Sequence, residues 1–279
     1  MAETVTTTFQ SAVEEGRRRL RRTPREVLAT GVVGGLDLGI GVIALLVVHH
    51  ATGSKMLAAL AFGIGFIALV LANSELFTEN FLVPIAALVT GKATGRQVAQ
   101  LWLGTLVGNL LGGWLVMAIA MSALPDLHGE AREFGTFYAD LGITWEAFAL
   151  ALLGGVAITL MTWMERGSST VGPKLVAAVS IAFVLVAAPL NHSIVGSLEM
   201  FAALQTGASF GYADWLGAFV LAVAGNVIGG VGLVTLLRLA QLPPNRFEEE
   251  KQRPVEEVDE RLDAEDEAAT EGPADDTES

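Results

Sequence analysis

A single histidine lies in the middle of an apolar segment, within the stretch VLVAAPLNHSIVG at residues 184–196. Asn191 and Ser193 flank His192, and Pro189 just before them removes a backbone donor and interrupts helical hydrogen bonding. Imidazole titrates near neutral pH and can donate a hydrogen bond, carry a positive charge or transfer a proton. An ionisable side chain inside a membrane segment is a functional candidate by default, because burying it in lipid is costly. These residue types favour a functional site inside the membrane, with His192 at its centre.

A second polar interruption, LANSELFTEN at residues 71–80, lies within another long apolar segment. The hydroxyl of Thr78 can donate and accept hydrogen bonds, so Thr78 is a candidate residue for the site. Membrane threonines also commonly bond to a carbonyl of their own helix, and that alternative stays open. We expect Glu75 to cap the half-helix that begins near Phe77, where the positive end of the helix dipole favours a carboxylate.

The two interruptions are related by an internal repeat. IAALVTG at 85–91 resembles FAALQTG at 201–207 at an offset of 116, and GNLLGG at 108–113 resembles GNVIGG at 225–230 at an offset of 117. The first offset places Asn191–Ser193 on Glu75–Phe77. Paired interruptions at equivalent positions of two repeats are the best sequence indication of a transport site. A kink at Pro189, with His192 packed against a neighbouring helix, is the structural alternative.

Asn109 and Asn226 occupy matching positions in the two GNxxGG motifs. Glycines at such positions allow helices to approach closely. Each asparagine could line the site or could satisfy backbone groups that the neighbouring interruption leaves free. We favour the second role for Asn109, whereas both roles remain open for Asn226.

The elements that must position these residues are membrane helices. Six apolar stretches reach the length of about 20 residues that spans a bilayer: 27–49, 55–90, 98–121, 145–164, 174–206 and 215–238. The second and fifth are too long for one simple helix and contain the polar interruptions. Three spans in each repeat would invert the second copy in the bilayer. The sequence therefore predicts an all-α membrane protein of two inverted three-helix repeats, with the second and fifth helices broken.

The distribution of Lys and Arg predicts the orientation. Fifteen of these residues lie before, between or after the spans on one side, and only Lys55 and Arg132 lie on the other. Both termini are therefore expected in the cytoplasm, with residues 27–240 forming the transmembrane domain. Residues 1–26 form a basic amphipathic segment that either lies on anionic membrane lipid or only sets the orientation. Residues 241–279 are strongly acidic with few large apolar side chains, and we expect a disordered cytoplasmic tail.

Composition excludes several other classes of protein. The chain of 279 residues is 52% hydrophobic with a mean hydropathy of +0.52 and contains no cysteine. The adjacent His49 and His50 point to different sides of a helix, so we expect no metal site. No phosphate-binding loop appears, which makes a nucleotide cofactor and ATP-driven pumping unexpected. No basic groove for nucleic acid appears, and no acid, base and nucleophile converge as an enzyme would require.

The motifs together resemble the formate/nitrite transporter family over roughly residues 27–240. The resemblance rests on VLANSELFT at 70–78, on NHSI at 191–194 and on the Gly-Asn and paired glycines of 225–230. The chain departs from the family pattern at several positions. Asn73 replaces a usual glycine, Glu79 replaces a small residue, Gly155 stands at a usual asparagine, and residues 133–144 lack a lysine that is often found at the outer mouth.

The resemblance implies a homopentamer of aquaporin-like protomers, each with its own pore, in the cytoplasmic membrane of a bacterium or archaeon. It implies passage of a small monovalent anion such as formate or nitrite, and protons could accompany it. His192 would lie mid-pore facing Thr78, with Asn226, Asn191 and Ser193 nearby and Glu75 and Asn109 in support. Hydrophobic constrictions are expected at Phe62, Phe66, Leu76 and Phe77. A pore for a small neutral solute and a non-transporting membrane scaffold or sensor are the alternatives.

Overall fold

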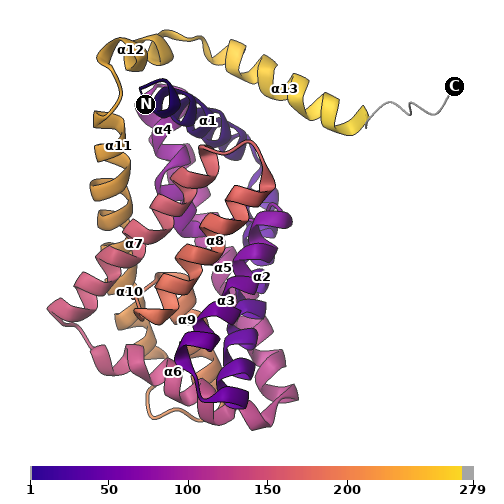
Figure 1. The fold of residues 1–279 in the computed structure, drawn as a ribbon, viewed down its shortest axis with the longest axis vertical. Coiled ribbons are helices and arrows are strands. Elements are labelled where there is room, and N and C mark those ends of the chain that lie inside the picture. Colours follow the sequence, from indigo (N-terminus) through magenta and orange to yellow (C-terminus); the bar gives the residue numbers. More distant parts are fainter. Residues whose placement is uncertain (1, 272–279) are drawn as a thin grey trace, which may run out of the picture.

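The computed structural model describes residues 2–271, and within that range every regular element is a helix. Four helices are long and apolar enough to cross a membrane. They are α2 (Pro24–Thr52), α5 (Gly95–Ala123), α7 (Trp145–Arg166) and the continuous run of α10 (Tyr212–Val227), the π-helical turn η3 (Ile228–Thr235) and α11 (Leu236–Ala240). They stand side by side in one bundle (Figure 1). The all-α fold class is confirmed.

Two further membrane segments are each divided into shorter helices. One consists of α3 (Lys55–Leu71), the 3-10 turn η1 (Phe77–Phe81) and α4 (Val83–Val89), and the other of α8 (Val171–Ala187) and α9 (Ser193–Gln205). Asn73 has a φ of 52° in the first break, a left-handed conformation that asparagine tolerates better than most residues. Pro189 lies in the second break. Both interruptions therefore fall where the sequence predicts them, at 72–76 and 188–192.

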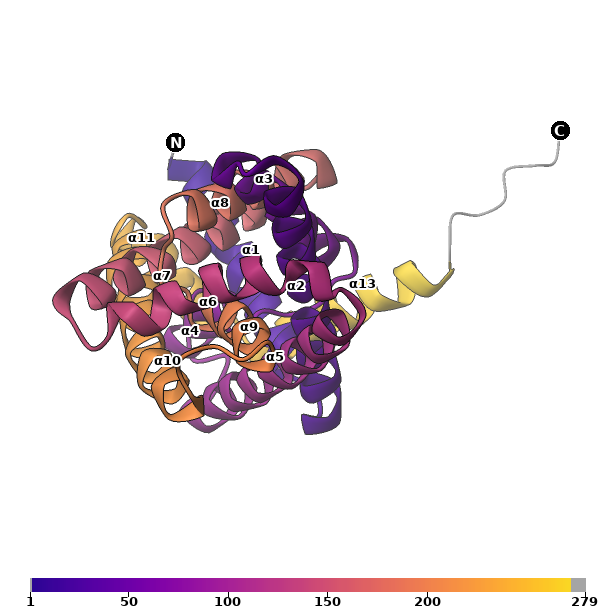
Figure 2. The same cartoon turned by 90° about the horizontal axis from the view of Figure 1, so that it is seen from below.

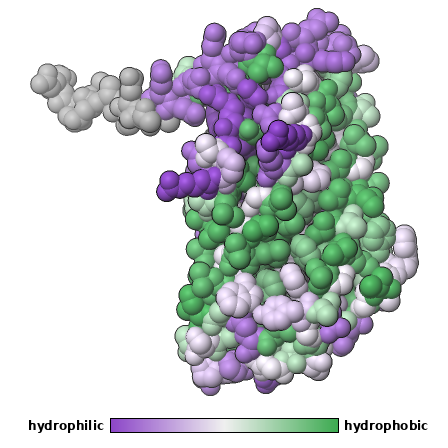
Figure 3. Space-filling model, turned by 180° about the vertical axis from the view of Figure 1, so that it is seen from behind, coloured by the Kyte–Doolittle hydropathy of each residue, from purple (hydrophilic) through white to green (hydrophobic). Residues whose placement is uncertain are grey.

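The surface divides into an apolar band between two polar ends (Figure 3). Exposed leucine, isoleucine and valine side chains cover the outer faces of the long helices, as expected where a protein faces lipid tails. We call the end of the bundle that carries α1 (Ala2–Leu20), α12 (Pro244–Gln252) and α13 (Val255–Glu271) the terminal end. The opposite, distal end carries the turn η2 (Pro125–Leu127) and α6 (His128–Leu141), which lies across α9 (Figure 2).

Glycines bring the long helices into close contact in the same way twice. A Cβ atom added to Gly35 on α2 would overlap the carbonyl oxygen of Asn109 on α5. A Cβ added to Gly155 on α7 would overlap the carbonyl oxygen of Asn226 on α10. Backbone-to-backbone packing of this kind requires glycine. The matched pairs support the duplication that the sequence predicts and explain why position 155 has no side chain.

Helix α1 has an apolar face, but that face packs on protein. Phe9, Ala12 and Val13 are buried in a cluster with Leu82 and Val83 at the start of α4. A Cβ at Gly16 would overlap the carbonyl oxygen of Val83, so the two helices touch along their backbones. The expectation that this segment lies on lipid is therefore wrong for its apolar face, since the bundle itself supplies the apolar partner.

The acidic segment after residue 240 also differs from expectation, because its described part is helical. Helix α13 buries Val258 and Leu262. Its carboxylates pair with the arginines of α1: Arg17 with Asp259 at 2.8 Å and Arg21 with Asp263 at 2.6 Å. The prediction of disorder considered only the acidity of the segment and its few large apolar side chains, and it missed the charge match to the basic helix α1. Residues 272–279 of the predicted tail lie outside the described residues.

We expect that an alanine at either of the two close glycines destabilises the bundle. Gly35→Ala and Gly155→Ala place a methyl group against a carbonyl oxygen, and overpacking of this kind costs about 1–3 kcal/mol or more. Gly217→Ala on α10 is the matched control, because open space surrounds that position. The measurement is the thermal unfolding midpoint of the detergent-solubilised protein. Midpoints of G35A and G155A equal to that of G217A would show that the close approach is not required.

Charge reversal in α13 should loosen its attachment to α1. Asp259→Arg is expected to speed hydrogen–deuterium exchange in α13 by about five-fold, the effect of a partly exposed ion pair of about 1 kcal/mol. Adding Arg17→Asp should restore protection by re-forming the pair in reverse, while Glu260→Arg on the exposed face of α13 should have little effect.

The same ion pair sets the expected pH dependence of α13 docking. The hydrogen bond from Arg17 lowers the pKa of Asp259 in the folded state. The contribution of this carboxylate is therefore complete above the usual pKa of aspartate and is lost as pH falls through the lowered value. Protection that is unchanged in D259R or that rises in acid would contradict this account.

Candidate functional site

His192 lies fully buried between the two broken segments, and each of its ring nitrogens takes part in one hydrogen bond. Its Nδ1 accepts the backbone N–H of Val195 at 3.1 Å and so caps the start of α9. Its Nε2 lies 2.7 Å from the hydroxyl of Thr78. Since Nδ1 accepts, the ring proton resides on Nε2 and is donated to Thr78; this tautomer is assigned from the hydrogen-bond network. The predicted meeting of the two interruptions is thus a direct contact.

Asn109 satisfies the backbone of the first break. Its Oδ1 accepts the N–H of Phe77 at 2.8 Å, and its Nδ2 donates to the carbonyls of Gly31 and Glu75, both at 2.8 Å. Backbone groups released by a broken helix need such partners when water is absent. The structural role favoured for Asn109 is therefore the one observed.

Asn226 makes the equivalent bonds at the second break. Its Oδ1 accepts the N–H of Ser193 at 2.8 Å, and its Nδ2 donates to the carbonyls of Ala151 at 2.7 Å and Asn191 at 3.0 Å. Both amide donors are used, so the geometry favours the structural role over direct contact with a solute. The same three-bond pattern at 109 and 226 also supports the duplication.

Asn191 and Ser193 differ in how well they are satisfied. Both are buried, and the Asn191 amide donates to the carbonyl of Ala147 at 3.2 Å. The hydroxyl of Ser193 has no hydrogen-bond partner among the described residues. Beside His192 it borders a void of about 10 Å³, which is roughly the space of one water molecule. The site therefore holds an unused polar group next to the imidazole.

The four residues predicted to constrict a passage are all buried in the apolar core. Phe62 and Phe66 meet edge to face at 5.7 Å between ring centroids. Leu76 and Phe77 directly precede Thr78, and the Phe77 ring meets those of Phe81 at 5.1 Å and Trp102 at 6.1 Å. Leu76 and Phe77 thus place buried apolar side chains directly before Thr78 in the chain.

Glu75 does not cap a helix as predicted. The turn η1 has no side-chain cap, and the N–H of Phe77 is taken by Asn109 instead. The Glu75 carboxylate is buried and forms ion pairs with Arg22 and, at 3.4 Å, with Arg19. The prediction failed because it did not consider that Arg19 on α1 and Arg22 just after α1 would lie beside the Glu75 carboxylate.

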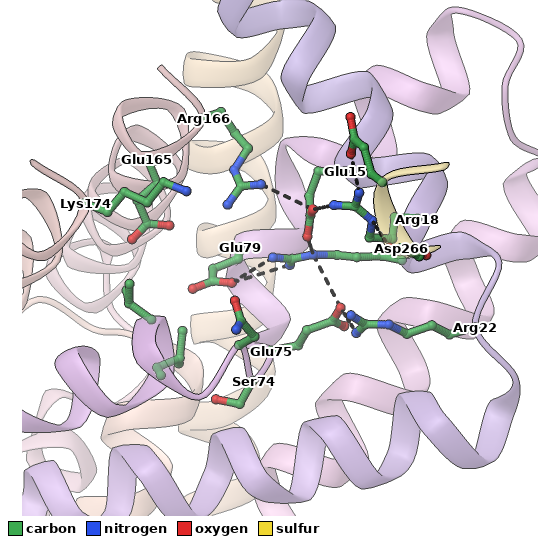
Figure 4. A pocket seen from close by; sticks show the side chains of 15 residues that line it. Glu15, Arg18, Arg22, Ser74, Glu75, Glu79, Glu165, Arg166, Lys174 and Asp266 are labelled. Atoms are coloured by element: carbon green, nitrogen blue, oxygen red, sulfur yellow. Dashed lines mark hydrogen bonds and ion pairs between the residues drawn. The ribbon is translucent and has the colours of Figure 1, made fainter. Parts of the chain in front are cut away.

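An ionic network joins α1 to the loop that carries Glu75 and Glu79 (Figure 4). The Arg19 side chain is buried and contacts Glu15 at 2.9 Å, Glu79 at 3.4 Å and the amide oxygen of Asn80 at 3.0 Å. Glu15 also lies 3.3 Å from Arg166. Burial opposes a charge on Glu15, but the surrounding arginines outweigh it and lower the pKa of this carboxyl to about 2.

The network borders a cavity of about 510 Å³ at the terminal end, which Glu165 and Lys174 also line. Sequence reasoning missed this role of α1, because it considered the arginines for orientation and lipid binding only. A signal was present: the acids Glu75 and Glu79 in an apolar segment require cationic partners. Tyr138 of α6 was also missed, although it borders the void beside His192.

Comparison with known proteins identifies the family of the chain. Residues 6–240 match the model of the family described as formate/nitrite transporter. The chain is 28% identical to "Inner membrane protein YfdC" of Escherichia coli over 240 residues, which cover 82% of this chain and 76% of that protein.

Two solved structures are similar in fold. One is titled "FNT family ion channel", with a TM-score of 0.75, 19% identity and coverage of 85% of this chain and 99% of that one. The other, "Pentameric formate channel with formate bound", has a TM-score of 0.66, 20% identity and coverage of 78% and 96%. The family match extends over both broken segments and the four long helices. The chain therefore belongs to the formate/nitrite transporter family, and it is a membrane transport protein rather than an enzyme.

Proposed function

We propose that the protein is a channel or proton-coupled transporter for small monovalent anions of the formate/nitrite type, and that the solute passes between His192 and Thr78. The observation that carries the proposal is the 2.7 Å contact between these residues, each on a broken segment. Formate bound to a pentameric channel of similar fold supports the solute class and a homopentamer. The excess of basic residues on one side supports cytoplasmic termini, and the YfdC similarity supports a bacterial inner membrane.

The site must offset the cost of removing water from an anion. The Nε2–H of His192 and the hydroxyls of Thr78 and Ser193 are donors at one level of the bundle. Helix α9 begins at Ser193, so its positive N-terminal end points at the same level. Together these groups can replace part of the hydration shell of a small anion.

The buried apolar side chains on either side would exclude water and bare ions. Phe62, Phe66, Leu76 and Phe77 would form the constrictions, which open only when a solute passes; dewetted apolar constrictions act as gates in other channels. The void of about 10 Å³ beside His192 fits a closed state. The described site also carries no fixed cation, an observation that favours passage of a neutral species, either the protonated anion or a small neutral solute.

The proposal is tested by solute flux into proteoliposomes. Formate, nitrite and hydrosulfide uptake is measured at acidic and neutral external pH, with glycerol and water flux as the test for a neutral-solute pore. We expect anion uptake that is faster in external acid, because proton coupling makes protons a co-substrate. His192→Ala should lower it by about ten-fold or more, because losing this buried partner costs roughly 1–3 kcal/mol. His50→Ala, at an exposed histidine, is the matched control and should retain the wild-type rate.

The outcomes separate the alternatives. If the wild type moves none of the three anions at either pH, the anion proposal fails. Glycerol flux without anion flux would instead identify a neutral-solute pore. Anion flux that is independent of pH would identify a channel without proton coupling.

Two variants of Thr78 distinguish a role of its hydroxyl group from a role of the shape of its side chain. Thr78→Val removes the acceptor for the His192 proton while keeping a branched side chain, and we expect it to lower anion uptake by roughly ten-fold. Thr78→Ser keeps the hydroxyl and should retain most of the uptake. Equal uptake by the valine and serine variants would show that the hydroxyl is not part of the path.

A further inference from the structure

Glu199 is a buried carboxyl group that the proposed function leaves without a role. It lies on α9 and is 3% exposed. Among the described residues no arginine, lysine or histidine forms an ion pair with it; its side chain interacts with the hydroxyl of Tyr138 on α6. Acids inside membrane segments without a cation typically belong to proton or ion pathways. Glu199 would have such a role if it connects the site to one end of the bundle.

Tyr138, the partner of Glu199, borders two cavities, one at the distal end and one beside His192. A cavity of about 160 Å³ at the distal end is lined by Tyr138 and Glu199 together with Lys55, Glu133 and Pro189. The void of about 10 Å³ on the other side is lined by Tyr138, His192 and the unpartnered Ser193. The Tyr138 ring packs on Gly196, one turn of α9 beyond His192. Tyr138 thus separates the distal cavity from the site.

Other charged groups around the pair have partners of their own. Lys55 pairs with Glu133 at 2.8 Å and lies over the Phe134 ring. Elsewhere on α6, Arg132 donates to the carbonyl of Thr206 and Glu130 pairs with His50. On α10, Asp214 accepts the N–H of Gly211. His192 is the remaining titratable group that lines either cavity, and its Nδ1 is occupied by the N–H of Val195.

The hydrogen bond that occupies Nδ1 of His192 bears on which group could give a proton to an anion at this site. To gain a second proton, the His192 ring would have to release the N–H of Val195 and place a cation at the positive end of α9. A donor other than the ring is therefore favoured. The Glu199–Tyr138 pair can be this donor. Glu199 carries a carboxyl proton, the Tyr138 hydroxyl can pass a proton on, and the adjoining distal cavity gives a route by which Glu199 can be protonated again.

We propose that Glu199 and Tyr138 form a proton-carrying pair that supplies the proton with which an anion at His192 is neutralised; this rests on the proposed function above. Tyr138 gives its hydroxyl proton to the anion and receives the carboxyl proton of Glu199. The Glu199 carboxylate then regains a proton from water in the distal cavity. The neutral acid passes on and releases its proton to water at the terminal end, so one proton moves with each anion.

The test measures protons and formate together. Proteoliposomes carrying a trapped pH-sensitive dye receive formate from outside, and internal acidification is recorded beside uptake of labelled formate, with empty liposomes subtracted. We expect about one proton for each formate in the wild type. Glu199→Gln and Tyr138→Phe should each lower the protons carried per formate by about ten-fold or more and flatten the pH profile, as loss of a positioned proton donor requires. Glu199→Asp keeps the acid and should restore part of the coupling.

Two matched controls accompany these variants. Glu133→Gln alters another acid of the same cavity, and Tyr212→Phe alters the second of the two tyrosines, so both should keep the wild-type ratio. Tyr138→Phe removes a single oxygen atom and decides the question if Glu199→Gln does not fold.

The inference fails alone if the wild type moves formate but E199Q and Y138F retain its proton ratio and pH profile. It also fails alone if wild-type formate uptake carries no proton. If the wild type takes up no formate, nitrite or hydrosulfide at either pH, the proposed function fails and this inference fails with it.

Discussion

The structure depends on one constraint: backbone groups exposed by a broken helix in an apolar environment must find partners inside the protein. The two breaks that create the site expose such groups around Phe77 and Ser193. Asn109 and Asn226 each accept one N–H and donate to two carbonyls at these points. They can do so because glycines bring α2 against α5 and α7 against α10. Without this satisfied frame, His192 and Thr78 could not be held face to face.

The two breaks could be predicted because they arise from two local patterns related by a repeat. Pro189 and the polar stretch at residues 71–80 mark the breaks, and the offset of the repeat aligns them. That His192 faces Thr78 was implied by the resemblance to the formate/nitrite transporter family. The tautomer of His192 could not be predicted fully, because half of it is set by the N–H of Val195, a detail of how α9 begins. The role of Asn226 remained open for the same reason: it depends on which carbonyls the fold brings near.

The contacts at the terminal end could not be predicted from local pattern, since they join segments far apart in the chain. Arg17 meets Asp259, and Arg19 meets Glu75 and Glu79. The acidic composition and few large apolar side chains suggested that α13 would be unfolded, yet its carboxylates pair with the arginines of the basic helix α1. Arg19 thereby joins α1 to the loop that presents Thr78, because Glu79 is the next residue after that threonine.

The wide turn η3 fixes the direction of a side chain that reaches the first broken segment. A π-helical turn takes in more residues than an α-helical turn, so each residue advances the helix by a smaller angle. Thr235, the last residue of η3, donates its hydroxyl proton to the carbonyl of Phe81, at the end of η1. If residues 228–235 wound as an ordinary α-helix instead, Thr235 would turn away from that carbonyl. The winding of the last membrane segment is therefore matched to a loop that lies 154 positions earlier in the chain.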